Sequence, residues 1–307
     1  MQLKSPKSKL KRLEEFVNYH NTGDGECNGV VLKGWADRHD LTRKERVDLC
    51  YFFAITYCVE SAIVLYLNQD EITADMENWV KANKDKIIFQ SDRKYIKMKN
   101  SFQKCLLTWL NNRDMIQEIS KETEIDLNKW IPKVEKYPLF GRFSAYLYLE
   151  TVAWLLNIEV KNAEMEWENG ATATSGLLHI YGYDSEAEEY DKTRKLKAPF
   201  NHEKLQEMVE PVLTAISMAN GDNNITKVET SLCAYRKFYK GTRYNGYYLD
   251  RMLEEIIEMR HEYPDISAEL LSIRAKSYST DYLGEIGGWN GIRKDMKKVY
   301  QKTGIIT

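Results

Sequence analysis

The chain has 307 residues, of which 43% are hydrophobic and 29% are charged, and its formal net charge is −2. This length suits one large domain or two small ones. The five cysteines are odd in number and form no CxxC pair, which argues against a disulfide framework and a zinc knuckle. With only 6 prolines and 16 glycines, the sequence leaves room for long helices.

Helical periodicity dominates the first half of the chain. Thr42 with Glu45 three residues later forms a capping box that starts a helix ending near Asn68. Asp126 is expected to cap a short helix, and Pro138 to open a long one through Asn157. The remaining predictions for this half are an amphipathic helix at 8–20, a glycine-containing loop at 21–40, a cap at Thr73 and a helix at 101–120.

The second half alternates irregular stretches with helices. Residues 163–182 read as irregular, and residues 183–200 as a charged stretch that marks a soft boundary. Helices are predicted at 201–219, 224–240, 245–262, from Pro264, and at 290–302. Short strands are candidates only at 87–89 and 177–181. The sequence therefore predicts an all-α fold, either a single domain over 1–307 or two helical lobes that meet near 183–200.

Residues 49–67 are apolar enough to resemble a membrane span. Glu60 lies near the middle of this stretch, where insertion of a charge would cost roughly 2.5–3.5 kcal/mol. We therefore interpret the stretch as the central helix of a helical domain. The first residues, MQLKSPKSKLKR, lack an apolar signal segment, so we expect a cytoplasmic protein without a membrane partner.

Residues 235–251 combine five basic residues and one acid with six aromatic residues. Phosphates attract cations, and unstacked bases need flat apolar surfaces, so this segment could contact nucleic acid. The alternative is an ordinary helix with buried tyrosines and solvated lysines. At its end, Asp250 and Arg251 fit either an ion pair or an acid beside a phosphate ligand.

Most standard catalytic motifs are missing from the sequence. It contains no GxxxxGK[ST] or GxGxxG phosphate loop, no GxSxG elbow and no HExxH pair. Glu60 and Glu150 are more informative, because each lies inside a strongly apolar helix, where burial would raise the pKa of a carboxyl toward neutrality. Each could instead pair with an arginine for structure. Arg142, at the start of its helix, is either an anion ligand or a simple capping-turn residue.

Three stretches together resemble the amino acid:DNA transferases, also called α-glutamyl/putrescinyl-thymine pyrophosphorylases, of bacteriophage thymine hypermodification. They are FFAITYCVESAIVLYL (52–67), the LFGRFSAYLYLETVAWLL and EWENGATATSGLL stretches within 139–178, and YNGYYLDRMLEEI (244–256). The resemblance implies a helical fold related to DNA glycosylases. It also implies DNA whose thymine methyl carries a pyrophosphate ester, which an amine such as that of an amino acid replaces.

That reaction assigns roles to candidate residues by their chemistry. Glu60 or Glu150 would deprotonate the amine, and Arg251 would bind the carboxylate of an amino acid. The candidates that neutralise pyrophosphate or contact DNA are Arg142, Lys240 and Arg243. The flipped base would stack on Trp167, Tyr244, Tyr247 and Tyr248. The sequence requires no metal, although pyrophosphate often travels with Mg²⁺.

The resulting hypothesis is a transferase that modifies bases in DNA, located in the cytoplasm of an infected bacterium if the resemblance holds. One alternative is a non-enzymatic helical protein that binds nucleic acid through residues 235–251. The other is a helical interaction protein whose tyrosines belong to its core. Convergence of Arg142, Lys240 and Arg243 on one cleft would favour the phosphate-binding hypotheses.

Overall fold

The computed structural model describes residues 9–90, 93–161, 171–221, 225–241, 243 and 246–277. Within these residues the fold is all-α, as predicted, with β1 (Glu124–Asp126) and β2 (Glu159–Lys161) as a short parallel pair. The chain forms two compact units. Unit 1 comprises Met1–Cys27 and Ala163–Tyr248, and unit 2 comprises Asn28–Asn162 and Leu249–Thr307. Residues 183–200 lie inside unit 1. The chain passes from one unit to the other after Cys27, after Asn162 and after Tyr248.

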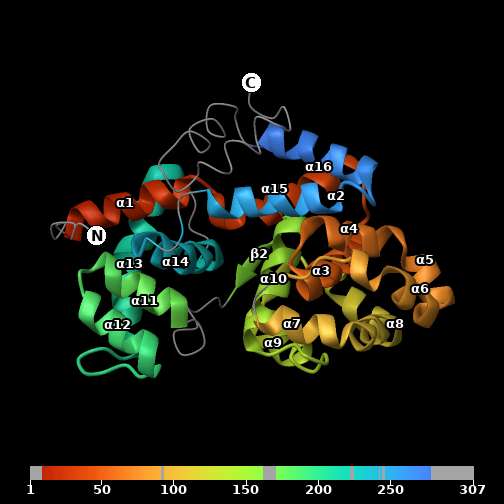
Figure 1. The fold of residues 1–307 in the computed structure, drawn as a ribbon. Coiled ribbons are helices and arrows are strands. Elements are labelled where there is room, and N and C mark those ends of the chain that lie inside the picture. Colours follow the sequence, from red (N-terminus) through yellow and green to blue (C-terminus); the bar gives the residue numbers. More distant parts are fainter. Residues whose placement is uncertain are drawn as a thin grey trace. The chain divides into compact units, whose positions relative to one another are not determined.

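Unit 2 is built around α3, a helix that is buried on nearly all sides. α3 packs against α4, α7, α8 and α10 (Figure 1). The helices of this unit before β1 are α2 (Cys27–Arg38), α3 (Arg43–Thr56), α4 (Val59–Leu67), α5 (Gln69–Ala74), α6 (Met76–Asn83), α7 (Arg93–Asn100) and α8 (Phe102–Glu118). The later ones are α9 (Leu127–Val134), α10 (Arg142–Leu156), α15 (Tyr247–Met259), whose first two residues fall in unit 1, and α16 (Pro264–Ser277).

The capping box predicted at Thr42 is present at the start of α3. The Thr42 side chain accepts a hydrogen bond from the Glu45 backbone, and the Glu45 carboxylate accepts one from the Thr42 backbone at 2.7 Å. The expected single helix through Asn68 is instead two helices. Tyr57 ends α3 with a left-handed φ of 53°, and α4 starts after Cys58 in a new direction. This break puts Glu60 in the first turn of α4.

A buried carboxylate ties α3 to α8. Asp48 is fully buried and accepts hydrogen bonds from Trp109 Nε1 at 3.0 Å, from the Arg113 guanidinium at 2.9 and 3.1 Å, and from Gln117 Nε2 at 2.7 Å. Burial raises the pKa of Asp48, while these donors lower it. Four hydrogen bonds to one carboxylate satisfy a charge that would otherwise be very costly inside the protein.

Unit 1 joins an N-terminal helix to four later ones. Its helices are α1 (Lys9–Asn21), α11 (Ala171–Ile180), α12 (Asp184–Thr193), α13 (His202–Asn220) and α14 (Ile225–Tyr239). α11 and α14 approach closely because Gly176 lies between them, where a Cβ atom would stand 2.3 Å from the Leu232 carbonyl oxygen. Arg12 of α1 is buried and donates to both oxygens of Asp184 and to the His179 carbonyl.

Several predictions of irregular structure or strand were wrong. Within 21–40 the chain forms α2, and Gly29 lies in this helix at a position where a Cβ atom would stand 2.0 Å from the Trp154 ring, so glycine is required there for packing. Residues 171–180, expected to be irregular with a strand at 177–181, form α11, and residues 87–89 form no strand. The long helix begins at Arg142 rather than at Pro138, and Asp75 rather than Thr73 is the cap.

Other predictions were confirmed. Asp126 caps α9 through the Asn128 backbone, and α13, α14, α15 and α16 cover the helices expected in the second half. The predicted helix at 290–302 lies outside the described residues. No helix in the described part of the chain is long and apolar enough to cross a membrane.

Candidate functional site

Glu60 is buried in the first turn of α4, with 1% of its surface exposed. One carboxyl oxygen accepts a short hydrogen bond from Ser267 Oγ of α16. The other, Oε2, is buried and has no hydrogen-bond partner among the described residues. The pKa of Glu60 is raised to about 8 by burial first and also by the neighbouring charge of Glu255, while the Ser267 hydrogen bond lowers it. The group therefore titrates near physiological pH.

Glu255 of α15 is the second carboxyl of this cluster, and the sequence analysis missed it. It is 4% exposed and accepts a hydrogen bond of 2.8 Å from Arg251 Nε one turn earlier on the same helix. The Cys58 side chain also hydrogen-bonds to it. Burial raises the pKa of Glu255 to about 7, although Arg251 and Cys58 lower it. Two interacting carboxyls with near-neutral pKa values form an acid–base pair.

Arg251, predicted to bind the carboxylate of an amino acid, forms an ion pair with Glu255 inside unit 2. It is 30% exposed, so one side of the guanidinium still faces solvent. Asp250, the preceding residue, is 1% exposed. Arg251 therefore has at least a structural role, because its hydrogen bond and charge lower the pKa of Glu255 and favour the ionised carboxylate.

Glu150 and Arg142 both lie on α10 of unit 2. Glu150 is 2% exposed within a helix that is buried on nearly all sides, as its apolar sequence indicated. Arg142 is the first residue of the helix and is half-buried, after Gly141 with extended backbone at the N-cap. Its position at the positive end of the helix dipole remains compatible with an anion ligand.

The part of the basic-aromatic segment up to Tyr248 belongs to unit 1, whereas Asp250 and Arg251 belong to unit 2. Lys240 and Arg236 both bind the Asp191 carboxylate of α12, with Lys240 Nζ 3.1 Å from Oδ2. Arg243 lies over the rings of Tyr247 and Tyr248, at 4.3 and 4.9 Å from their centroids, and donates to the Tyr248 hydroxyl. Arg243 thus packs on two of the tyrosines predicted to contact DNA, and Lys240 pairs with an acid, as the structural alternative for this segment expects.

Trp167 and Tyr244, the other two predicted stacking residues, lie outside the described residues. Arg142 belongs to unit 2, whereas Lys240 and Arg243 belong to unit 1, so their convergence on one cleft stays a prediction. The structure does bring together Glu60, Glu255 and Arg251. Among the described residues, no three His, Cys, Asp or Glu side chains form a group that could hold a metal ion.

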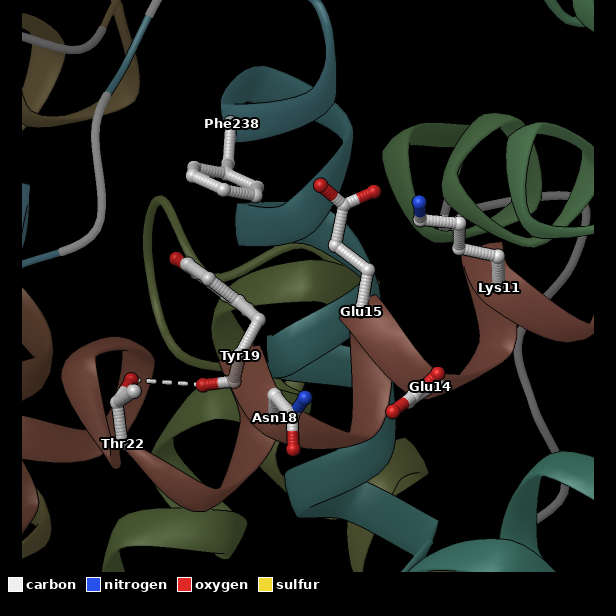
Figure 2. Close-up of a pocket in the computed structure, with 7 residues that line it drawn as sticks. All are labelled: Lys11, Glu14, Glu15, Asn18, Tyr19, Thr22 and Phe238. Carbon is white, nitrogen blue, oxygen red and sulfur yellow. Dashed lines mark hydrogen bonds between the residues drawn. The ribbon is translucent and has the colours of Figure 1, made fainter. Parts of the chain in front are cut away.

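A polar groove of about 480 Å³ runs along α1 in unit 1. Figure 2 shows the Tyr19 ring beside Phe238 of α14, with ring centroids 5.1 Å apart and an angle of 24° between the planes. Tyr235 OH donates to Glu15 at 3.3 Å on the same wall. Acids and a lysine share the groove, so its charge selects neither anions nor cations strongly. Its lining residues are Lys11, Glu14, Glu15, Asn18, Tyr19, Thr22 and Phe238.

An all-α chain with two buried carboxyls that titrate near neutrality has the groups needed for proton-transfer chemistry. The family model of the amino acid:DNA transferases matches residues 52–244, and the chain therefore belongs to this family. It is a transferase that acts on DNA, with an amino acid and DNA as its substrates. No curated protein and no solved structure matches the chain.

Family membership favours the transferase over the two alternatives from the sequence, a binding protein and an interaction protein. The matched region contains Glu60, Glu150 and Arg142. It ends before α15, so Glu255 and Arg251 lie beyond it. The family model therefore covers Glu60 of the acid–base pair but not Glu255.

Proposed function

We propose that this transferase replaces the pyrophosphate of 5-(pyrophosphoryloxymethyl)uracil in DNA with the amine of an amino acid. The nitrogen lone pair forms a C–N bond to the former thymine methyl carbon, the C–O bond to pyrophosphate breaks, and the nitrogen loses a proton. The observation that carries the proposal is the family match over residues 52–244. The stretches that resemble the pyrophosphorylases of bacteriophage thymine hypermodification support the finer choice of substrate.

The acid–base pair supports a role in activating the amine. The ammonium group of a free amino acid has a pKa above the roughly 7.7–8.0 of a peptide N-terminus, so at neutral pH a base has to remove its proton before the nitrogen can attack. A carboxyl with a raised pKa, such as the value of about 8 for Glu60, is a stronger base than an ordinary carboxylate once it is ionised. Glu255, with a pKa of about 7 beside Arg251, is the carboxyl that is more often ionised at neutral pH. In this proposal Glu60 and Glu255 together take up the amine proton, and Glu150 is a second candidate.

The remaining roles follow the chemistry of the substrate. The leaving pyrophosphate needs cations, for which Arg142, Lys240 and Arg243 are the proposed ligands. If Mg²⁺ accompanies the pyrophosphate, it would share in neutralising that charge. The thymine must leave the base stack before its methyl carbon can be attacked. A bacteriophage origin and action in the bacterial cytoplasm belong to the same proposal.

The test is a transfer assay. The protein is incubated with DNA that contains 5-(pyrophosphoryloxymethyl)uracil and a pool of amino acids and polyamines, and the digested nucleosides are analysed by mass spectrometry. A single new adduct would support the proposal and identify the donor. Unchanged substrate beside an active control transferase would overturn it.

Variants then test the proton-transfer role. Glu60→Gln and Glu255→Gln keep shape while removing the titrating group, and each is expected to lower turnover by about 10²–10⁴-fold. Glu77→Gln, on the exposed surface of α6 in the same unit, is the matched control and should keep full activity. Full activity in both Glu60→Gln and Glu255→Gln would remove the pair from the mechanism.

A further inference from the structure

The turn between α9 and α10 in unit 2 is fixed by two buried aromatic rings. Tyr137 and Phe140 are each 4% exposed. Phe140 stacks on Tyr51 of α3, with ring centroids 5.6 Å apart and an angle of 13° between the planes. A backbone hydrogen bond of 3.0 Å from Phe140 N to Tyr137 O closes the turn. The backbone between these anchors has little freedom to move.

Leu139 lies between the two anchors and points the other way. It is 39% exposed, and its φ is +70°. For a residue with a Cβ atom, this left-handed conformation costs roughly 1–2 kcal/mol. An apolar side chain that is exposed in a strained backbone gains nothing for stability. Such strain persists where the surroundings impose it, and it concentrates at functional sites.

A second exposed apolar side chain follows within one helical turn. Phe143, the second residue of α10, is 47% exposed. Two cations are close in sequence: the exposed Lys136 precedes Leu139, and the half-buried Arg142 lies between Leu139 and Phe143. One acid, Glu135, is nearby in sequence. We name Lys136, Leu139, Arg142 and Phe143 the α10 corner.

The α10 corner combines rigid apolar side chains with flanking positive charge. Proteins that bend or open duplex DNA insert such apolar side chains between base steps, while cations contact the phosphates. Since this family acts on DNA, a duplex is the partner whose charge and stacked bases complement the corner. Other exposed apolar residues of unit 2, such as Leu107 on α8, lie on regular helix surface and have ordinary backbone conformation.

We propose that Leu139 and Phe143 enter the base stack of duplex DNA beside the target thymine and fill the space that it leaves. Lys136 contacts an adjacent backbone phosphate, and Arg142 keeps its proposed role as a ligand of the leaving pyrophosphate. This inference rests on the proposed function, in which the thymine must leave the stack to expose its methyl carbon. Leu139 and Phe143 are positioning residues, because they act on the duplex and do not touch the reacting atoms.

The test compares one activated-thymine strand in duplex and single-stranded form. The variants are Leu139→Gly, which removes the side chain and also relieves the positive φ, and Phe143→Ala. Leu107→Ala, 42% exposed in the same unit, is the matched control. The double variant is expected to lose at least 30-fold in kcat/KM on duplex DNA and less than 3-fold on the single strand, where no stack has to be opened. The control should match the wild type on both.

A fluorescence measurement follows the same step without turnover. 2-Aminopurine placed beside the target thymine should brighten when the wild-type protein binds the duplex, and this increase should be lost in the double variant. Equal losses on duplex and single strand, or no loss on either, would overturn the proposal. If the wild type transfers no amine on either DNA, the proposed function fails, and the 2-aminopurine signal still decides whether the α10 corner opens the stack.

Discussion

Replacing Glu60 with glutamine should make the stability of unit 2 less dependent on pH. The buried carboxyl has a pKa of about 8 in the folded protein against an ordinary value of 4.5. Between these two pH values the folded chain keeps a proton that the unfolded chain releases. The stabilising contribution of the protonated group is complete below pH 4.5 and is lost as pH rises through about 8.

The size of this effect follows from the interval between the two pKa values. Each pH unit is equivalent to about 1.4 kcal/mol, so the interval corresponds to about 5 kcal/mol. Water penetration and the coupling to Glu255 make this an order of magnitude. Glutamine retains an oxygen that can accept the Ser267 hydrogen bond but never ionises. The Glu60→Gln variant should therefore gain stability relative to the wild type as pH rises from 5 to 8.

Urea unfolding at several pH values, followed by tryptophan fluorescence, measures this difference. Trp35, Trp109 and Trp130 are buried in unit 2 and report on it. Glu77→Gln on the exposed surface of α6 is the control and should follow the wild type at every pH. If the free energies of unfolding of wild type and Glu60→Gln run parallel from pH 5 to 8, the buried carboxyl does not retain its proton and the reasoning fails.

Two further predictions concern packing and buried charge. Gly176→Ala should destabilise unit 1 by about 1–3 kcal/mol, because its Cβ would lie 2.3 Å from the Leu232 carbonyl oxygen. Gly25→Ala is the control and should change stability little, since its Cβ would lie 3.5 Å from its nearest neighbour. Equal thermal midpoints for the two variants would contradict this prediction. Asp48→Ala should cost about 1–3 kcal/mol, since it leaves the buried Trp109 Nε1 without its acceptor, whereas Arg113 is 37% exposed and keeps Gln69 as a partner. A loss below about 0.5 kcal/mol in urea unfolding would refute that role.

The sequence predicted those helix ends that are set by capping residues close by in the chain. The capping box at Thr42 and the cap at Asp126 were both found, because each depends on side chains within three residues of the helix end. The break after α3 was missed. It depends on Tyr57 in a left-handed conformation that bulky residues rarely adopt, so composition carries no sign of it.

Tertiary contacts decided the elements that sequence reasoning missed. The clustered glycines before Trp35 suggested a loop, but Gly29 lies inside α2, where the absence of a Cβ makes room for the Trp154 ring. Glu60 could be singled out because its sequence neighbours are apolar. Glu255 could not, since it stands in a charged stretch and becomes buried only through packing. Likewise, Lys240 meets Asp191 across 49 residues of sequence, beyond any local pattern.

The division of unit 1 into two chain segments has a consequence for synthesis on the ribosome. Arg12 of α1 is buried against His179, 167 residues later in the chain. At roughly 5–20 residues per second, α1 emerges about 10–30 s before the helices that cover its apolar side. During that interval the apolar side of α1 is not yet covered by the later helices of its unit. Slowing translation between residues 28 and 162 should lengthen the interval and lower the yield of folded protein.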